Sequence, residues 1–316
     1  MSDYPLRIQK LQPQDPYLQP LLEEAALLLP GNEFDRVKGK MALEDIIHSS
    51  QGLVLRRQQE ILAMLLYTIK ESTCRVSFAY AQKEGDARLL LFHLLKGLVA
   101  LAELDGELSN IRCDVVAWFP DSLEQALQLN NFTRIERKTM RRVAAYPTNA
   151  PPFPPAFRQI PWDTWLTTPA SQILHLAFGA GFEGSWDRSL TEMSGCKQFL
   201  SDCYTGRYGT FDPAISFALQ YENMWAGIAL ASWSNGGEGF IPAFGLLPQY
   251  TGKGIGSIML HHLLLHFGRS HFPPPAIELA VSKDNKPAVA LYEKFGFSER
   301  SRFYVYYRDI KQLSAS

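Results

Sequence analysis

Residues 248–256 read PQYTGKGIG and place glycine at three alternate positions, Gly252, Gly254 and Gly256. An apolar run, 240–247, precedes this stretch, and apolar residues at helical spacing follow it over 255–267. The pattern predicts a strand, a tight glycine turn and a helix. Backbone N–H groups at such a helix N-terminus bind phosphate oxygens, aided by the helix dipole, and glycine lets the backbone approach them closely. The stretch therefore predicts a site for a ligand that carries a pyrophosphate.

Two common phosphate-binding motifs do not match this turn. No Gly-Lys-Ser/Thr follows four spacer residues, as a Walker loop requires. Ser257 stands where a G-x-G-x-x-G dinucleotide fingerprint has its third glycine. A plain glycine turn before a buried helix is the alternative interpretation of these residues alone.

The composition predicts a globular protein of about two domains. The 316 residues are 46% hydrophobic and 20% charged, with a net charge of −1, which does not favour a nucleic-acid or membrane-binding surface. No apolar run reaches the length of a membrane span, and we expect no secretory signal. The four cysteines form no C-x-x-C pair, so we expect free thiols in a reducing compartment and a cytoplasmic location.

Three histidines, His261, His262 and His266, follow the glycine turn on the expected helix. His262 and His266 lie one helical turn apart, a spacing that would allow a shared metal ion. No H-E-x-x-H pattern accompanies them, so we favour a partly exposed helix face and expect no metal site.

A proline-rich segment divides the chain near its middle, with five prolines between 146 and 155. We predict domains at 1–146 and 157–316, joined by an extended linker at 147–156. The two halves repeat one element order, and Phe132 and Phe297, each just before a last polar strand, are 297 − 132 = 165 positions apart, which suggests a duplication. In the first half we expect strands at 6–11, 53–57, 61–69, 74–81, 111–118 and 133–141 and helices at 17–29, 41–48, 86–104 and 123–129. In the second half we expect strands at 157–162, 215–221, 225–233, 239–247, 277–281 and 302–307 and helices at 168–182, 189–204, 255–267 and 286–294.

The halves differ at the glycine turn. The corresponding segment of the first half, 81–86, reads AQKEGD and holds one glycine and two acids, which would repel a pyrophosphate. We therefore predict one ligand site per chain, in the second half.

Three motifs of the second half resemble those of the GCN5-related N-acetyltransferase (GNAT) superfamily. They are LLPQYTGKGIG at 246–256, ELAVSKDN at 278–285 and AVALYEKFGF at 288–297, in the family's order and spacing. The resemblance covers roughly 157–310, and the whole chain resembles a tandem arrangement also found in mycothiol synthase. It implies an α/β (α+β) fold of two tandem GNAT-like domains, each a mixed, mostly antiparallel sheet flanked by helices, with the first domain degenerate.

The resemblance implies acetyl-CoA as the acetyl donor. In this family the strand before the turn splays from its neighbour and pairs with the pantetheine arm, and the N–H of Leu246 would polarise the thioester carbonyl. Asn285 would bond the pantetheine arm, cap the next helix, or do both. Many members carry Arg where this chain has Thr251, so we expect weaker or differently tuned binding. The residues implied in acetyl-CoA binding are Phe244, Gly245, Leu246, Thr251, Gly252, Lys253, Gly254, Ile255, Gly256 and Asn285.

Tyr292 matches the family's tyrosine general acid, which would protonate the departing CoA thiolate. Transfer to an amine also needs a proton acceptor, and Glu238, which opens the strand leading to Leu246, is our first choice. Other candidates are Glu222 and Glu278 for the base and Tyr208 and Tyr221 for substrate contacts.

We expect acetyl-CoA-dependent N-acetylation of a small amine by direct transfer in a ternary complex, because no cysteine sits in a recognisable nucleophile motif. One alternative is a non-catalytic acyl-CoA sensor or scaffold. Another is an aminoacyl transferase on a tandem GNAT fold, which the near-neutral charge and the CoA-type motifs disfavour. In this family acceptor specificity comes largely from the first two helices and their loop, here 168–208; the aromatic residues there, Phe178, Phe182, Trp186 and Tyr204, are core residues by default.

Overall fold

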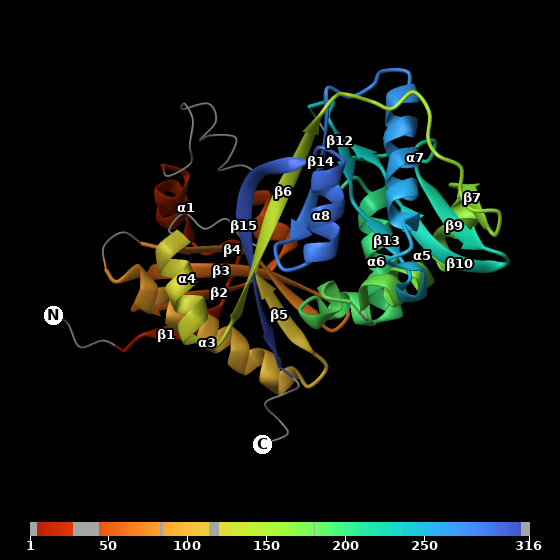
Figure 1. The fold of residues 1–316 in the computed structure, drawn as a ribbon. Coiled ribbons are helices and arrows are strands. Elements are labelled where there is room, and N and C mark those ends of the chain that lie inside the picture. Colours follow the sequence, from red (N-terminus) through yellow and green to blue (C-terminus); the bar gives the residue numbers. More distant parts are fainter. Residues whose placement is uncertain are drawn as a thin grey trace. The chain divides into compact units, whose positions relative to one another are not determined.

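The structure is a computed structural model that describes residues 5–27, 44–82, 85–113, 120–179, 181–234 and 236–310. The chain divides into two units, residues 1–135 with 304–316, and residues 136–303. Strands β6 (Thr133–Val143) and β15 (Ser298–Asp309) contribute residues to both units (Figure 1). The proline-rich segment at 147–156 belongs to the second unit, and the domain limits at 146 and 157 stay a prediction about the repeat.

The first unit is a mixed sheet in the order β1-β2-β3-β4-β5-β15. Only β4 and β5 run parallel; the other neighbours in this order are antiparallel. Helix α3 connects the parallel pair. The elements are β1 (Arg7–Lys10), α1 (Leu18–Leu27), β2 (Gln51–Arg57), β3 (Glu60–Lys70), β4 (Thr73–Ala81), α3 (Ala87–Asp105), β5 (Asn110–Cys113) and α4 (Pro120–Leu129), with further helical residues at 44–49.

Both faces of this sheet are buried because successive side chains of a strand point to opposite sides. Leu53 and Leu55 of β2 pack in one apolar cluster with α3 and α4. Val54, between them, packs in another cluster with α1. Strands β2 and β3 therefore read as continuous apolar runs and not as alternating ones.

The second unit holds two sheets. One has the order β15-β6-β14-β12-β11-β8, in which β12 and β14 are parallel, and the other has the order β13-β10-β9-β7. The strands are β7 (Phe157–Pro161), β8 (Thr210–Phe211), β9 (Phe217–Tyr221), β10 (Met224–Ala229), β11 (Ser232–Trp233), β12 (Gly239–Ile241), β13 (Phe244–Leu246) and β14 (Ala276–Ser282). The helices are α5 (Thr167–Leu174), a π-helix (His175–Gly179), α6 (Met193–Tyr204), α7 (Ile255–Arg269) and α8 (Lys286–Lys294), with short 3₁₀ turns at Thr164–Leu166, Glu183–Ser185, Arg188–Thr191 and Pro248–Tyr250.

Helix α7 and the π-helix lie on opposite faces of the four-stranded sheet, as two of its glycines indicate. A Cβ added to Gly227 of β10 would lie 3.1 Å from Met259 of α7. A Cβ added to Gly245 of β13 would lie 2.6 Å from the Phe178 ring of the π-helix. Gly227 is paired with Leu246, so a Cβ on Gly227 would point to the same face as the Leu246 side chain. Gly245 precedes Leu246 in β13, so a Cβ there would point to the opposite face.

The predicted order of elements is confirmed in both halves, with three corrections. The strand predicted at 239–247 is divided into β12 and β13 at Pro242, which has no N–H for the ladder. The strand predicted at 225–233 is likewise divided into β10 and β11. The helix predicted at 168–182 ends as an α-helix at Leu174 and continues as the π-helix. The predicted ends at 28–29, 41–43 and 114–118 lie outside the described residues, and within those residues no helix is long and apolar enough to cross a bilayer.

Candidate active site

Strands β12 and β13 follow one another along the chain, and the chain bends and changes neighbours at Pro242. β12 pairs in parallel with β14 as far as Ile241 opposite Leu279. β13 then pairs with β10 and is an edge strand of the other sheet. The divergence between this run and β14, implied by the family resemblance, is confirmed.

The hydrogen bonds between β10 and β13 fix which backbone groups face outward. The N–H of Leu247 donates to the Ala226 carbonyl at 2.8 Å, and the N–H of Leu230 donates to the Ala243 carbonyl at 2.8 Å. Because the bonded residues alternate along an antiparallel pair, the N–H of Leu246 points away from β10, toward an edge that no described strand covers. An extended ligand added at this edge would meet that N–H group. This is the orientation that the predicted contact between Leu246 and the thioester carbonyl requires.

The glycine turn presents a row of backbone donors at the start of α7. Gly252 and Gly254 have φ of 72° and 80°, in the left-handed region that favours glycine. The first N–H groups bonded within the helix are those of Ser257 and Ile258, both to the Gly254 carbonyl. Among the described residues, the N–H groups of 252–256 have no hydrogen-bond acceptor. They are therefore available to an anion, at the positive end of the helix dipole.

Thr251 does not extend this row. Its hydroxyl donates to the Pro248 carbonyl at 2.7 Å, in the 3₁₀ turn that precedes the glycines. Lys253, the cation predicted near the phosphates, is exposed. The main groups of this turn that could bind an anion are therefore backbone N–H groups, and the solvated Lys253 side chain is a secondary one.

Asn285 caps helix α8. Its side chain accepts a hydrogen bond from the Ala288 N–H at 3.4 Å, and Pro287 follows in the first turn. At the other end of the helix Gly296 has φ of 79°, and the Phe297 N–H donates to the Tyr292 carbonyl at 3.1 Å. The capping role of Asn285 is thus confirmed, and its contact with pantetheine stays a prediction.

Replacing Asn285 by Ala should lower the free energy of unfolding by about 0.5–1 kcal/mol, because the cap is lost while the helix is kept. Chemical denaturation of the two proteins measures this difference. Asn285→Ser, which keeps a capping oxygen, should stay near the wild-type value. Equal stability of the Ala variant would mean that this long hydrogen bond contributes nothing.

Tyr292 lies buried beside the open edge of β13. Its side chain is 7% exposed, and its ring centroid lies 6.3 Å from that of Phe244 and 5.8 Å from that of Phe297. Among the described residues, its hydroxyl has no hydrogen-bond partner. Burial, and then the charge of Glu183, raise the pKa of Tyr292 well above its usual value, although Arg137 opposes them. The phenol therefore stays protonated near neutral pH and can donate a proton.

Glu183 is a buried carboxylate that the sequence analysis did not single out. It is 9% exposed, and its Oε2 accepts a hydrogen bond at 3.1 Å from the hydroxyl of Ser282, the fully buried last residue of β14. Its only sequence signal is its place in the segment 168–208, where acceptor contacts were expected. No motif marks it, since its partner lies 99 residues away.

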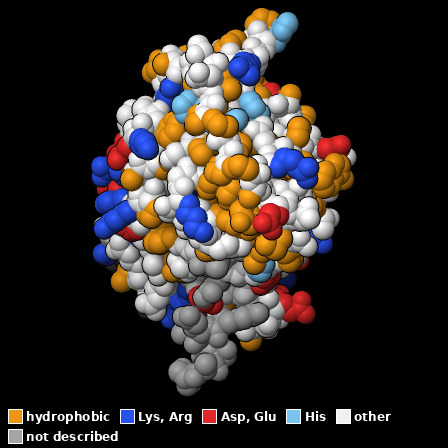
Figure 2. Space-filling view, turned by 45° about the vertical axis from the view of Figure 1, so that its right-hand side comes forward, with side chains coloured by type: hydrophobic (Ala, Val, Ile, Leu, Met, Phe, Trp, Pro, Cys, Tyr) orange, Lys and Arg blue, Asp and Glu red, His pale blue; other side chains and the backbone are white. Residues whose placement is uncertain are grey.

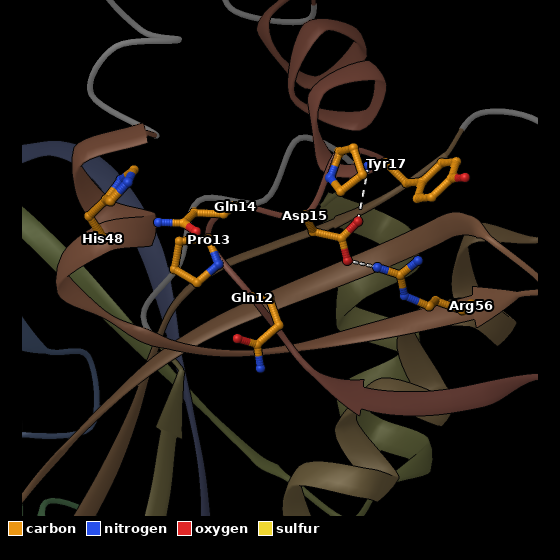
Figure 3. Close-up of a pocket in the computed structure, with 8 residues that line it drawn as sticks. Gln12, Pro13, Gln14, Asp15, Tyr17, His48 and Arg56 are labelled. Atoms are coloured by element: carbon orange, nitrogen blue, oxygen red, sulfur yellow. Dashed lines mark hydrogen bonds and ion pairs between the residues drawn. The ribbon is translucent and has the colours of Figure 1, made fainter.

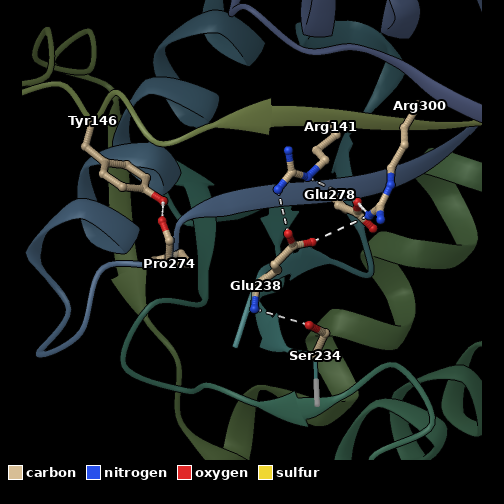
Figure 4. Close-up of polar contacts among 7 residues, drawn as sticks. All are labelled: Arg141, Tyr146, Ser234, Glu238, Pro274, Glu278 and Arg300. Atoms are coloured by element: carbon tan, nitrogen blue, oxygen red, sulfur yellow. Dashed lines mark hydrogen bonds and ion pairs between the residues drawn. The ribbon is translucent and has the colours of Figure 1, made fainter. Parts of the chain in front are cut away.

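Glu238 is placed elsewhere, in a network of charged side chains (Figure 4). Its carboxylate lies 2.6 Å from the Arg141 guanidinium and 3.6 Å from that of Arg300. The hydrogen bond from Arg141 lowers the pKa of Glu238, which makes it a weaker proton acceptor. Seven residues lie between Glu238 and Leu246, and the chain bends at Pro242 among them. No described contact joins Glu238 to Leu246 or Tyr292, and Glu278 belongs to the same charged network.

The remaining candidates, Glu222, Tyr221 and Tyr208, make other contacts. Glu222 forms the β9–β10 turn with φ of 54°. The Tyr221 ring lies 5.2 Å from that of Tyr250, and the Tyr208 ring lies 5.3 Å from that of Phe199. None of these contacts links them to Tyr292.

Two of the three histidines of α7 contact backbone carbonyls, and the third, His261, contacts the Phe295 ring. His262 Nε2 lies 2.9 Å from the Pro151 carbonyl, and His266 Nδ1 lies 3.1 Å from that of Ile215. Within the described part of the chain, no three His, Cys, Asp or Glu side chains form a group that could hold a metal ion.

In the first unit, the helix that corresponds to α7 has an acid at its start. Asp86 caps α3, accepting a hydrogen bond from the Leu89 N–H at 3.2 Å, and this bond lowers its pKa. A carboxylate thus already occupies the helix N-terminus, where it would repel a pyrophosphate.

An open hollow of about 620 Å³ lies in the first unit (Figure 3). Its cation, Arg56, forms an ion pair with Asp15, which also accepts a hydrogen bond from the Tyr17 N–H at 3.0 Å. The hollow therefore offers an anion no uncompensated positive charge. Its lining consists of Gln12, Pro13, Gln14, Asp15, Pro16, Tyr17, His48 and Arg56.

Large apolar side chains also reach solvent, and Figure 2 shows a face on which they gather. In the second unit Trp165 is 56% exposed and Met224 is 59% exposed. The Trp165 ring centroid lies 5.9 Å from that of Trp225, next to Met224. Exposed apolar groups of this kind often mark contact surfaces, so a partner of the second unit would be sought there.

Comparison with known proteins bears on this arrangement. Residues 185–297, which include the glycine turn, Asn285 and Tyr292, match the family model described as acetyltransferase (GNAT) family. No curated protein matches the chain in sequence.

Solved structures share the fold along the chain. A GCN5-related N-acetyltransferase from Sphaerobacter thermophilus is 16% identical with a TM-score of 0.60, each chain being 96% covered. A tandem GNAT protein from the clavulanic acid biosynthesis pathway is 13% identical with a TM-score of 0.57, covering 97% of this chain and 99% of that one. A GCN5-related glucosamine N-acetyltransferase region of a fungal multi-domain β-N-acetylglucosaminidase is 11% identical with a TM-score of 0.58, covering 98% of this chain and 38% of that one.

At these identities the structural likeness establishes the fold and not the reaction. It confirms the predicted class of two tandem GNAT-like domains built on mixed, mostly antiparallel sheets. Together with the family match, it confirms the resemblance carried by three short motifs: residues 185–297 match the model of the GNAT acetyltransferase family, and the chain has the fold of tandem GNAT proteins.

Proposed function

We propose that the second unit transfers an acetyl group from acetyl-CoA to a small primary amine. The observation that carries this proposal is that one short stretch, 244–256, joins the open edge of β13 to the row of free N–H groups at α7. The spacing suits a ligand with an extended amide-bearing arm and a pyrophosphate. Acetyl-CoA has both, and it supplies the activated acetyl group.

The residues present fit this donor. Backbone N–H groups of 252–256 would hold the pyrophosphate, and the outward backbone groups of Phe244 and Leu246 would pair with the pantetheine amides. The Leu246 N–H would stabilise negative charge on the carbonyl oxygen. Tyr292, held next to Phe244, would donate its phenol proton to the leaving sulfur.

Direct transfer is supported by the state of the thiols. Cys196 and Cys203 of the second unit are fully buried, and burial raises the pKa of Cys196 to about 11 and that of Cys203 to about 12. A thiolate nucleophile is therefore disfavoured, and no acetyl-cysteine intermediate is needed. All four cysteines are free, which fits our proposal of a cytoplasmic location.

The first unit then has a supporting role, since the start of α3 is capped by its own carboxylate. We propose one acetyl-CoA site per chain, a small-molecule acceptor, and no nucleic-acid or membrane partner, in line with the net charge of −1.

Two measurements test the function together. Thermal-shift titration should show stabilisation by acetyl-CoA, and a thiol assay should show CoA release that depends on an added amine. Binding without release above hydrolysis would favour the sensor or scaffold alternative. Failure of acetyl-CoA to bind would favour the aminoacyl-donor alternative.

A further inference from the structure

The connection between α5 and α6 contacts both of the diverging strands. Phe178, in the π-helix, packs against the backbone of β13 at Gly245, where a Cβ would lie only 2.6 Å from the ring. Glu183, five residues later, accepts a hydrogen bond from Ser282 at the end of β14. The connection thus reaches one strand with an aromatic ring and the other with a carboxylate.

The two contact points are held at a fixed separation by a close backbone approach. A Cβ added to Gly184 would lie 2.1 Å from the Gly179 carbonyl oxygen, so only glycine fits there. The π-helix between α5 and this contact inserts an extra residue into the helical turn, an irregularity found frequently at functional sites. The position of Glu183 is therefore built into the fold.

Among the described residues, the carboxylate of Glu183 has no ion-pair partner. The residue is 9% exposed, and the Ser282 hydroxyl, a neutral group, is the one hydrogen-bond donor to its carboxylate among the described residues. No Lys, Arg or His of the described residues lies within ion-pair distance of it, and its Oε1 has no hydrogen-bond partner there. A buried carboxylate without a counterion is costly unless a ligand supplies the positive charge.

Aromatic rings lie on the elements that hold this carboxylate and Tyr292, and the cation Arg137, which packs over the Trp186 ring at 5.3 Å, also acts on Tyr292. Phe178 lies on the β13 side, and Phe244 contacts Tyr292 with ring centroids 6.3 Å apart. Glu183 also acts electrostatically on Tyr292, so the carboxylate and the phenol share one neighbourhood. An ammonium group attached to an apolar body matches one carboxylate among aromatic rings better than a polyamine or an amino sugar does.

We propose that Glu183 receives the ammonium group of a primary amine with an apolar body and accepts the proton that must leave before attack. This inference rests on the proposed acetyl transfer and names the acceptor class and the proton acceptor of that same site. It assigns to Glu183 the role predicted from the sequence for Glu238.

One ammonium proton passes to the Glu183 carboxylate, which later releases it to solvent. The amine nitrogen forms a bond to the thioester carbonyl carbon, and the carbon–sulfur bond breaks with its electron pair going to sulfur. Sulfur takes the phenol proton of Tyr292, and the surplus proton on the new amide nitrogen restores that phenol. The net products are the N-acetyl amine, CoA thiol and one proton.

The test compares Glu183→Gln with Glu238→Gln, a matched change of carboxylate to amide in the same unit. The probe is 2-phenylethylamine, and 2-phenylethanol is its uncharged analogue. With acetyl-CoA as donor we expect Glu183→Gln to lower kcat/KM for the amine at least 100-fold and to leave the Kd of acetyl-CoA unchanged. Glu238→Gln should stay within about threefold of wild type on both measures.

Binding separates this inference from the proposed function. In the presence of CoA, 2-phenylethylamine should raise the Tm of the wild-type protein and not that of Glu183→Gln, and 2-phenylethanol should raise neither. Unchanged kcat/KM in Glu183→Gln with continued turnover would overturn the role of Glu183 and leave acetyl transfer standing. No amine-dependent rise in the wild-type Tm would also overturn it. A third outcome is that acetyl-CoA binds and the amine binds in a way that depends on Glu183, but no CoA is released. That outcome would refute acetyl transfer and leave the amine site at Glu183 standing.

A second variant covers the case in which Glu183→Gln does not fold. Ser282→Ala removes the hydrogen bond that orients Glu183 and leaves its charge in place. We expect kcat/KM for 2-phenylethylamine to fall about tenfold with an unchanged acetyl-CoA Kd, as the loss of one hydrogen bond of about 1.5 kcal/mol predicts. A Ser282→Ala protein as active as wild type would contradict the proposed contact.

Discussion

Tyr292→Phe should lower kcat for acetyl transfer about 10²- to 10³-fold and leave the Kd of acetyl-CoA unchanged. The variant loses only the phenol proton, and general acid catalysis by one side chain contributes about 10²–10⁴ in rate. The ring contacts with Phe244 and Phe297 are kept. Because the hydroxyl has no hydrogen-bond partner among the described residues, its removal should not lower the free energy of unfolding.

Tyr146→Phe is the matched control for this prediction. The Tyr146 hydroxyl donates to the Pro274 carbonyl at 2.5 Å (Figure 4), so its loss should cost about 1 kcal/mol of stability and no catalysis. The two variants should therefore show opposite patterns in denaturation and steady-state assays. Unchanged turnover of Tyr292→Phe with every amine tested would show that Tyr292 is not the acid.

The sign of the Tyr292 pKa shift gives a second readout. A free tyrosine loses its proton near pH 10, and burial raises this pKa, so the phenol remains a donor over the whole range in which amines become neutral. Ionisation of Tyr292 should therefore cause no fall in the wild-type kcat between about pH 8 and 9.5. The kcat–pH profiles of the wild type and of Tyr292→Phe should have the same shape in this range. A fall in kcat in that range that occurs in the wild type and not in Tyr292→Phe would mean that the phenol loses its proton there. That result would contradict a pKa raised by burial.

The sequence predicted those parts of the site that are formed by contiguous residues. The glycine turn, the start of α7 and the cap at Asn285 depend on local backbone preferences, and each lies where its motif placed it. The division at Pro242 could also have been predicted, because proline interrupts a ladder wherever its N–H is needed.

The proton acceptor could not be found in this way because it depends on distant pairs. Glu238 was chosen for its position on the strand that leads to Leu246, but Arg141 and Arg300 come from β6 and β15 and hold its carboxylate there. Glu183 lies between helices, in a segment that shows neither helical periodicity nor a motif. It becomes a candidate only in the structure, where the Ser282 hydroxyl of β14 donates a hydrogen bond to it. A contact across 99 residues leaves no trace in a single sequence.

Gly252→Ala should weaken acetyl-CoA binding about tenfold or more, because the turn must hold Gly252 at a φ of 72° to aim its N–H groups at the pyrophosphate. An alanine in this region costs about 1–2 kcal/mol, and relaxing to negative φ would rotate the following N–H away. Gly237→Ala is the matched control. Its φ is 76°, and at both glycines an added Cβ would meet no atom within 4 Å, so the strain alone should be equal.

Both variants should therefore lose a similar free energy of unfolding, about 1 kcal/mol, while only Gly252→Ala changes donor binding. Calorimetric titration measures the Kd of acetyl-CoA directly. S-acetylpantetheine, which lacks the pyrophosphate, then localises the effect. Gly252→Ala should lower kcat/KM for acetyl-CoA and not for S-acetylpantetheine, since the open edge of β13 and Tyr292 are unchanged. An equal loss with both donors would place the defect in the fold of the turn, and an equal loss in Gly237→Ala would remove the glycine turn as the phosphate site.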